Sequence, residues 1–117
     1  MKPPIIIVGD GQVEVFSSLN SLKQSLEAVD AELYQAYDSD GQALQLNGHC
    51  EEGSWLGIRW LRNGTVTLDA YEEPMMRVDE LRRALLDWWN RTGGKDDASN
   101  WSLEELLAAI VCRDGVK

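Results

Sequence analysis

Basic residues are missing from a long central stretch of the chain. No lysine or arginine occurs from Gln24 to Ile58, although seven acidic residues do. Over the whole chain, 20 acids against 11 bases give a formal net charge of −9. A chain of this charge repels phosphate backbones and lacks the clustered cations that nucleic acid binding requires. We therefore expect no nucleic acid ligand and favour a partner with a cationic surface. Acidity that serves only solubility is an equally good explanation of the net charge.

Cysteine and long apolar runs are also scarce. Cys50 and Cys112 can form at most one bridge, so a disulfide framework is excluded and a reducing compartment is expected. The first apolar run, Ile5 to Val8, is too short for the core of a signal peptide, and no stretch approaches the length of a membrane span. We therefore expect a cytoplasmic protein that makes no membrane contact.

Few residues could support catalysis or bind a metal. The single histidine, His49, stands next to Cys50, and neighbouring residues on an extended chain point to opposite sides. A Cys–His enzyme is therefore a minor alternative, as is a hydrolase that uses two carboxylates in a cleft. The segment Asp38-x-Asp40-Gly41 is similar to the start of a calcium loop, but His49 stands where the loop needs a glutamate. We expect no catalytic residue, no metal and no cofactor.

The composition indicates one globular domain, residues 1–117. Apolar residues make up 44% and charged residues 26% of the chain, which is long enough to fold without disulfides or metals. β-Branched residues around Gly9-Asp10-Gly11 predict a short N-terminal strand or hairpin. A helix capped by Ser17 or Ser18 should follow, because apolar residues recur there every three or four positions. These apolar residues are Leu19, Leu22, Leu26 and Val29.

Residues 32–74 predict an antiparallel meander of four strands. Extended segments alternate there with turn residues, and Gly41 can supply the positive φ that closes the first turn. The expected strands are Leu33–Tyr37, Ala43–Asn47, Trp55–Arg62 and Thr65–Tyr71.

The hydrophobic pattern selects the register of the last two strands. A two-residue loop, Asn63-Gly64, would place Arg59 among apolar residues, because a one-residue slip exchanges the faces of a strand. A three-residue loop, Arg62-Asn63-Gly64, unites the apolar residues instead, and we choose it. Its pairs are Trp60 with Val66, Ile58 with Leu68 and Leu56 with Ala70. The other face then carries Trp55, Gly57, Arg59, Leu61, Thr65, Thr67, Asp69 and Tyr71. That face either binds a partner protein or is covered by the last helix.

Two helices should follow the meander. Asp79 and Glu80 favour the positive end of the first helix, which Gly93-Gly94 ends. Ser102 and Glu105 form a capping box for the second, from Leu103 to about Cys112. The only basic cluster belongs to the first of these helices: Arg77, Arg82, Arg83 and Arg91. The predicted fold class is α+β, a four-stranded antiparallel meander with a short N-terminal strand or hairpin, packed against an N-terminal helix and two C-terminal helices.

The segment ELYQAYDSDG, residues 32–41, is followed by Leu44 and Leu46. It resembles small bacterial immunity proteins encoded beside polymorphic toxins of the type VI secretion and Rhs kind, in which a Tyr-x-x-Tyr-Asp-x-x-Gly strand and turn precede a meander. The resemblance covers roughly residues 13–90 and leaves the segment from Trp101 to Lys117 outside. It implies a non-enzymatic inhibitor that docks on a toxin domain and blocks its active site.

The charge pattern and this resemblance together predict a partner-binding site. Toxins that act on nucleic acid or nucleotides carry cationic clefts, which an acidic surface with aromatic anchors can plug. The expected site residues are Asp38, Asp40, Glu51, Glu52, Trp55, Arg59, Asp69, Tyr71, Glu72 and Glu73. Trp55 and Tyr71 would be the anchors, and the protein would be a monomer or a weak homodimer.

A second hypothesis comes from another class of protein. Small, acidic α+β secretion chaperones or adaptors hold an unfolded segment of their effector and usually self-associate through a helix. The sequence leaves this possibility open, and dimerisation through a helix would favour it.

Overall fold

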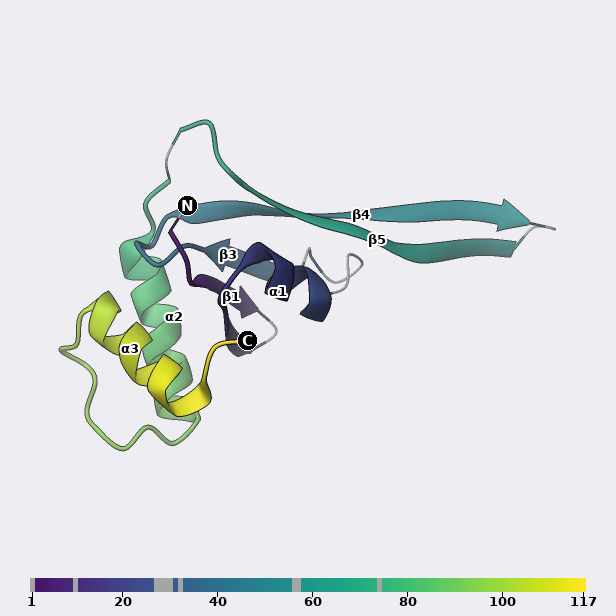
Figure 1. The fold of residues 1–117 in the computed structure, drawn as a ribbon. Helices are drawn as coiled ribbons and strands as arrows, with labels where there is room; N and C mark the ends of the chain where they lie inside the picture. Colours follow the sequence, from purple (N-terminus) through teal and green to yellow (C-terminus); the bar gives the residue numbers. More distant parts are fainter. Residues whose placement is uncertain (1, 10, 27–30, 32, 56–57, 74) are drawn as a thin grey trace.

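The computed structural model describes residues 2–9, 11–26, 31, 33–55, 58–73 and 75–117, with the backbone alone at positions 49–55 and 58–65. It is an α+β fold in which three helices surround one five-stranded antiparallel sheet of order β2-β1-β3-β4-β5 (Figure 1). The molecule measures 58 × 33 × 20 Å, because two of the strands extend well beyond the others.

The predicted N-terminal hairpin is confirmed, and it forms one side of the sheet. Strand β1 (Ile5–Gly9) pairs with β2 (Gln12–Phe16), and β1 also pairs with β3 (Tyr34–Tyr37) through Ile6↔Tyr37 and its neighbours. Because successive side chains of a strand alternate between faces, β1 contributes to two cores. Ile5 and Ile7 belong to one core and Ile6 to the other, and all three are at most 3% exposed.

Helix α1 (Leu19–Ser25) covers one face of the sheet. The predicted cap is confirmed, since the Ser18 hydroxyl oxygen accepts the Ser21 backbone N–H at 3.2 Å. Leu22 is fully buried, but the helix is shorter than the three turns that the apolar spacing predicted. The core beneath it consists of Ile5, Ile7, Phe16, Leu22, Ala36, Leu44 and Leu68.

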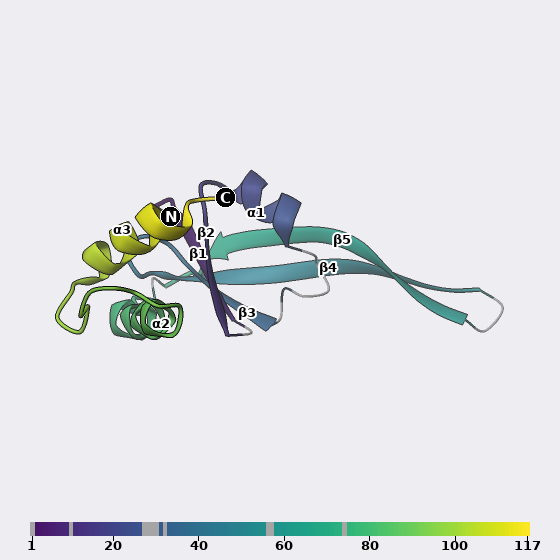
Figure 2. The same ribbon diagram turned by 90° about the horizontal axis from the view of Figure 1, so that it is seen from below.

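Helices α2 (Val78–Arg91) and α3 (Leu103–Asp114) pack against the opposite face of β1 and β2 (Figures 1 and 2). The capping box is confirmed, because the Ser102 hydroxyl oxygen accepts the Glu105 N–H at 3.2 Å and the Glu105 carboxylate accepts the Ser102 N–H at 3.5 Å. The shared core includes Ile6, Val13, Val15, Leu81, Leu85, Trp89, Leu106 and Ile110.

The four-strand meander is wrong in its strand boundaries. Two long strands, β4 (Ala43–Trp55) and β5 (Ile58–Ala70), replace three expected strands and the acidic loop between them. Thr65 pairs with His49 and Arg62 pairs with Glu51, so the two residues Asn63 and Gly64 lie opposite the single residue Cys50. The expected hairpin loop Arg62-Asn63-Gly64 is therefore wrong, because Arg62 is paired and Asn63-Gly64 forms a β-bulge within β5, which leaves one residue without a partner.

Burial in the core explains why β5 pairs with β4 along its length instead of forming the expected hairpin. Val66 lies opposite Gly48 and Leu68 lies opposite Leu46, so both β5 residues bury their side chains on the α1 face, as predicted for that face of the strand. The expected hairpin would have paired Val66 with Trp60 instead and left β4 short. Pairing with β4 places Val66 and Leu68 at only 4% exposure.

The outcome is a two-stranded ribbon that projects from the body (Figures 1 and 2). Strand β3 pairs with only the first two residues of β4, through Ala36↔Leu44 and Tyr37↔Ala43, whereas β4 and β5 remain paired as far as Trp55↔Ile58. At about 3.3 Å per residue, each of these strands spans roughly 40 Å. Two-stranded ribbons are only marginally stable alone in water.

Candidate functional site

The turn between β3 and β4 is a structural element. The Asp38 side chain is 2% exposed, and its Oδ1 accepts the backbone N–H groups of Asp40 and Gln42, both at 2.9 Å. Its Oδ2 also accepts the Lys2 backbone N–H at 3.4 Å. The expectation that Asp38 contacts a partner is therefore wrong, because its carboxylate already serves the backbone of its own turn. Asp40 in the same turn is exposed, and its carboxylate lies 3.5 Å from Lys2 Nζ.

One face of β4 and β5 carries polar residues and no helix. In the described residues, α2 and α3 share their core with β1, β2, Tyr37 and Ala43, but with no residue of β5. The register places Gln45 opposite Asp69 and Asn47 opposite Thr67, on the face away from α1. We call this surface the open face and define it by Gln45, Asn47, Thr67, Asp69 and Tyr71. Tyr71 is 38% exposed.

A groove lies where β3 separates from β4. Because the two strands stop pairing after Leu44, the residues that follow on β4 are not matched by a described residue of β3. The groove has a volume of about 320 Å³. Its lining residues are Ala31, Tyr34, Gln35, Leu44, Gln45, Leu46, Asn47 and Tyr71. Three amide residues and two tyrosines thus line the groove together with apolar residues, and such a mixed lining suits a peptide better than a small apolar ligand.

The structure brings some of the predicted site residues together. Asp69 and Tyr71 belong to the open face, and Glu72 and Glu73 are exposed immediately after it. The backbone of the ribbon holds four more: Glu51, Glu52, Trp55 and Arg59. The side chains of these four lie outside the described part of the chain.

The bulge separates one predicted residue from the others. Asp69 lies opposite Gln45, and the alternation along β4 keeps Trp55 on the same face as Gln45. Arg59 lies opposite Ser54, one position away from Trp55, so its backbone position belongs to the other face. The expected grouping of Arg59 with Trp55 and Asp69 is therefore wrong, because the extra residue in the bulge changes the alternation along β5.

Basic residues at the other end of the molecule are engaged in internal contacts. Arg82 donates to the backbone carbonyl oxygens of Trp101 at 2.7 Å and Ser99 at 2.6 Å. Arg91 donates to the Gly11 carbonyl oxygen at 2.9 Å and to the Asp87 carboxylate at 2.7 Å. Two of the four arginines predicted as a basic cluster therefore bind other parts of the fold.

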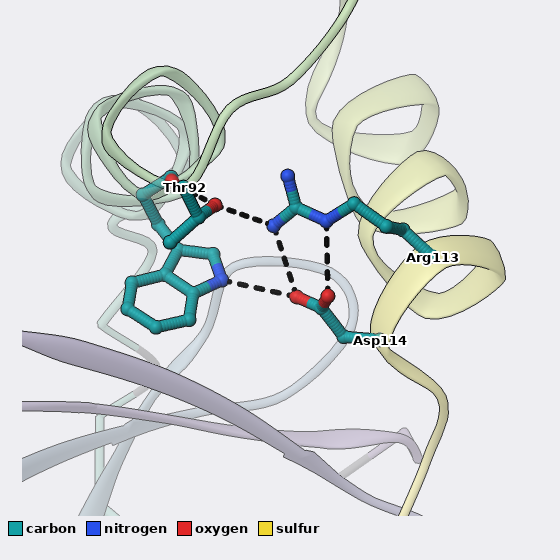
Figure 3. A network of polar contacts seen from close by, with 4 residues as sticks. Thr92, Arg113 and Asp114 are labelled. Carbon is teal, nitrogen blue, oxygen red and sulfur yellow. Dashed lines mark hydrogen bonds and ion pairs between the residues drawn. The ribbon is translucent and has the colours of Figure 1, made fainter.

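A further arginine joins the ends of α2 and α3 (Figure 3). Arg113 Nη2 donates to Thr92 Oγ1 at 2.6 Å and to Asp114 Oδ2 at 3.0 Å, and Trp88 Nε1 donates to the same carboxylate oxygen at 3.2 Å. Hydrogen bonding to Arg113 is the main cause that lowers the pKa of Asp114. The Arg113 guanidinium also lies 4.6 Å from the centre of the Trp89 ring.

The alternation of the sequence could identify the open face but not the groove. Gln45 and Asn47 alternate with Leu44 and Leu46, which is the usual signature of a strand with one polar face. Nothing in the sequence states where β3 leaves β4, and that separation forms the groove.

In the part of the chain that the structure describes, each helix is too short or too polar to cross a lipid bilayer. Within the same residues, no three histidine, cysteine or acidic side chains converge as metal ligands would. No protein-family model, curated protein or solved structure matches this chain.

Proposed function

We propose that the protein is a non-enzymatic immunity protein that neutralises a cognate bacterial toxin by covering a basic surface of it. The observation that carries this proposal is the open face on a projecting ribbon, one strand of which, β4, lies within the part of the chain that has no basic residue. Asp69, Glu72 and Glu73 are exposed within two positions of the exposed Tyr71, so acids and an aromatic residue share this part of the surface. Protein interfaces favour such anchors with polar rims.

Physical arguments support a partner for the ribbon. A two-stranded ribbon gains stability when another surface packs on it, because it has little core of its own. An acidic surface on a chain of net charge −9 raises the rate at which it meets a cationic protein. Neither argument requires a catalytic residue, a metal or a cofactor.

A secretion chaperone or adaptor is the second candidate function. The observation that favours it is the side of β4 facing β3, where residues after Leu44 have no described β3 partner and an extended segment of an effector could pair. The two functions differ in self-association, because chaperones of this kind usually dimerise through a helix. A monomer by light scattering at micromolar concentration favours the immunity function.

The proposed function can be tested with the protein encoded by the neighbouring gene. Its expression alone should arrest growth, and co-expression with this chain should restore growth if the two form a toxin–immunity pair. Purified proteins should bind with an affinity that falls as salt increases, because exposed charges are screened.

A matched pair of charge reversals locates the interface. Asp69→Lys with Glu72→Lys should weaken binding by about tenfold or more and slow association. Asp96→Lys with Glu104→Lys changes the net charge equally, at exposed positions after α2 and on α3, and these helices share no core residue with β5 among the described residues. Equal effects of the two double variants would show that only the net charge matters and would refute the assignment of the open face.

A further inference from the structure

The sheet has three strand edges without a neighbouring strand, on β2, on β5 and on β4 beyond Leu44, and they are protected to different degrees. The outer edge of β2 is covered at its end, Val15–Ser17, by the last residue of the chain, since the Lys117 N–H donates to the Val15 carbonyl oxygen and the Ser17 N–H donates to the Lys117 carbonyl oxygen, both at 2.9 Å. Lys117 Nζ also pairs with Glu14 at 2.6 Å. The covered part of this edge cannot accept a further strand.

Strand β5 is protected in another way. The bulge at Asn63-Gly64 interrupts its alternation in the middle of the ribbon, and bulges are one of the features that prevent edge strands from pairing with other chains. Within the described residues, neither a bulge nor a covering segment is present where β4 leaves β3. Among the described residues, the stretch Gln45–Asn47 pairs on the β5 side but has no β3 partner on the other.

The groove lies along this same stretch of β4. Gln45, Leu46 and Asn47 all line it, and Tyr34 and Tyr71 line it with them. An extended peptide recognised by strand addition needs two things: backbone groups to pair with, and side-chain pockets beside them. The edge and the groove provide both at one place.

The charge around the groove defines the chemistry of its ligand. Both strands that border it, β3 and β4, lie inside the stretch from Gln24 to Ile58 that contains no lysine or arginine. Asp69, opposite Gln45 on β5, and the two glutamates after Tyr71 add further negative charge. An acidic segment would be repelled here, and a basic segment would be attracted.

We infer that the groove between β3 and β4 binds an extended basic segment of a partner protein, which adds as a strand to the edge of β4 at Gln45–Asn47. This inference rests on the proposed function for the nature of the partner, but the segment itself is defined by the groove. In this arrangement the partner's backbone pairs with β4, its apolar side chains enter the groove, and its lysine or arginine side chains face the surrounding acids.

A synthetic peptide tests the inference without the natural partner. The probe is a short fluorescent peptide of alternating lysine and valine, and its binding to the full chain is followed by anisotropy. The control peptide has the same sequence with every backbone nitrogen methylated, so that it keeps the charge but cannot donate to a strand. We expect the methylated peptide to bind at least about tenfold more weakly, which corresponds to a difference of about 1.4 kcal/mol.

Two variants of equal charge place the site on the surface. Asn47→Lys puts a cation in the groove, whereas Gln24→Lys makes the same change of amide to cation on the exposed surface of α1. Asn47→Lys should lose at least about fivefold more affinity than Gln24→Lys, with thermal unfolding confirming that both remain folded. In hydrogen exchange, the peptide should protect the backbone amide of Leu46, which alternation places on the β3 side of β4, whereas those of Gln45 and Asn47 face β5.

The outcomes separate this inference from the proposed function. Four results would each overturn strand addition at β4. These are equal binding of the two peptides, equal effects of the two variants, protection confined to β5, and no binding up to about 1 mM. Binding of the neighbouring gene's product is measured independently, so a toxin that docks on the open face without adding a strand would leave the proposed function intact. A peptide that binds as expected beside a neighbouring protein that does not would overturn the proposed function alone.

Discussion

The buried carboxylate of Asp38 allows a quantitative test of the turn that starts β4. Asp38→Ala removes the acceptor of two backbone N–H groups at 2.9 Å, and the site is 2% exposed, so water cannot easily replace it. A hydrogen bond to a charged group contributes about 1.5–3 kcal/mol, and an unsatisfied buried donor costs about 1–3 kcal/mol. These terms overlap, so we expect the free energy of unfolding to fall by about 2–4 kcal/mol.

A conservative variant separates hydrogen bonding from charge. Asp38→Asn keeps a neutral oxygen that can accept the Asp40 and Gln42 N–H groups, and charge-assisted bonds are about twice as strong as neutral ones. It should therefore lose only about 1 kcal/mol. Asp40→Ala, at an exposed position of the same turn, should change stability by less than about 0.5 kcal/mol.

Urea unfolding followed by circular dichroism measures all three variants, with equal m values as the condition for comparing them. The expected order of stability loss is Asp38→Ala, then Asp38→Asn, then Asp40→Ala. If Asp38→Ala unfolds at the same urea concentration as the wild type, or as Asp40→Ala, the carboxylate does not hold the turn. In that event Asp38 would again be a candidate for contact with a partner.

Three further predictions follow from other parts of the fold. Burial, with Glu80 beside it, raises the pKa of Tyr37 to about 12. Tyr37 therefore ionises first in the unfolded chain, and its contribution to stability is fully present below about pH 10 and is lost as the pH rises from about 10 to 12. Tyr37→Phe should remove this part of the alkaline loss in pH-dependent unfolding curves, and an unchanged slope would contradict the assignment. Ser102→Ala removes the cap of α3 and should cost about 1 kcal/mol in chemical unfolding, whereas Ser102→Asp should restore most of it. Arg113→Met removes the contacts with Thr92 and Asp114 and should return the Asp114 pKa, measured by NMR titration, towards its ordinary value, whereas a pKa that stays low would assign the shift to Trp88.

Local chemistry explains the parts of the fold that the sequence predicts well. The Ser18 cap, the Ser102–Glu105 capping box and the Gly41 turn each depend on residues within a few positions of one another. Gly41 has a φ of +87°, and a Cβ at this position would lie 2.8 Å from Val78 Cγ2, so its turn and its close packing both require glycine. Such signals specify an element and its ends without knowledge of the rest of the chain.

The ribbon was not predictable in this way, because its register is set by long-range packing. Asn63-Gly64 is a strong local signal for a hairpin, and only the burial of Val66 and Leu68 above α1 shows that it is a bulge in a longer strand. Gly48 and Gly53 predict an interruption, yet both are paired positions of β4. Exposed acids at Asp69, Glu72 and Glu73 were expected from alternation and turn composition, but the burial of Asp38 depends on a hydrogen-bonded turn that composition does not distinguish from an exposed one.

The central claim is that the open face binds a basic protein, and hydrogen exchange of the complex with the neighbouring gene's product tests it most directly. Backbone amides of Gln45–Asn47 and Thr67–Glu73 should exchange more slowly in the complex than in the free protein, while α2 and α3 keep their rates. Protection that falls on α2 and α3, with no change along the open face, would contradict the claim.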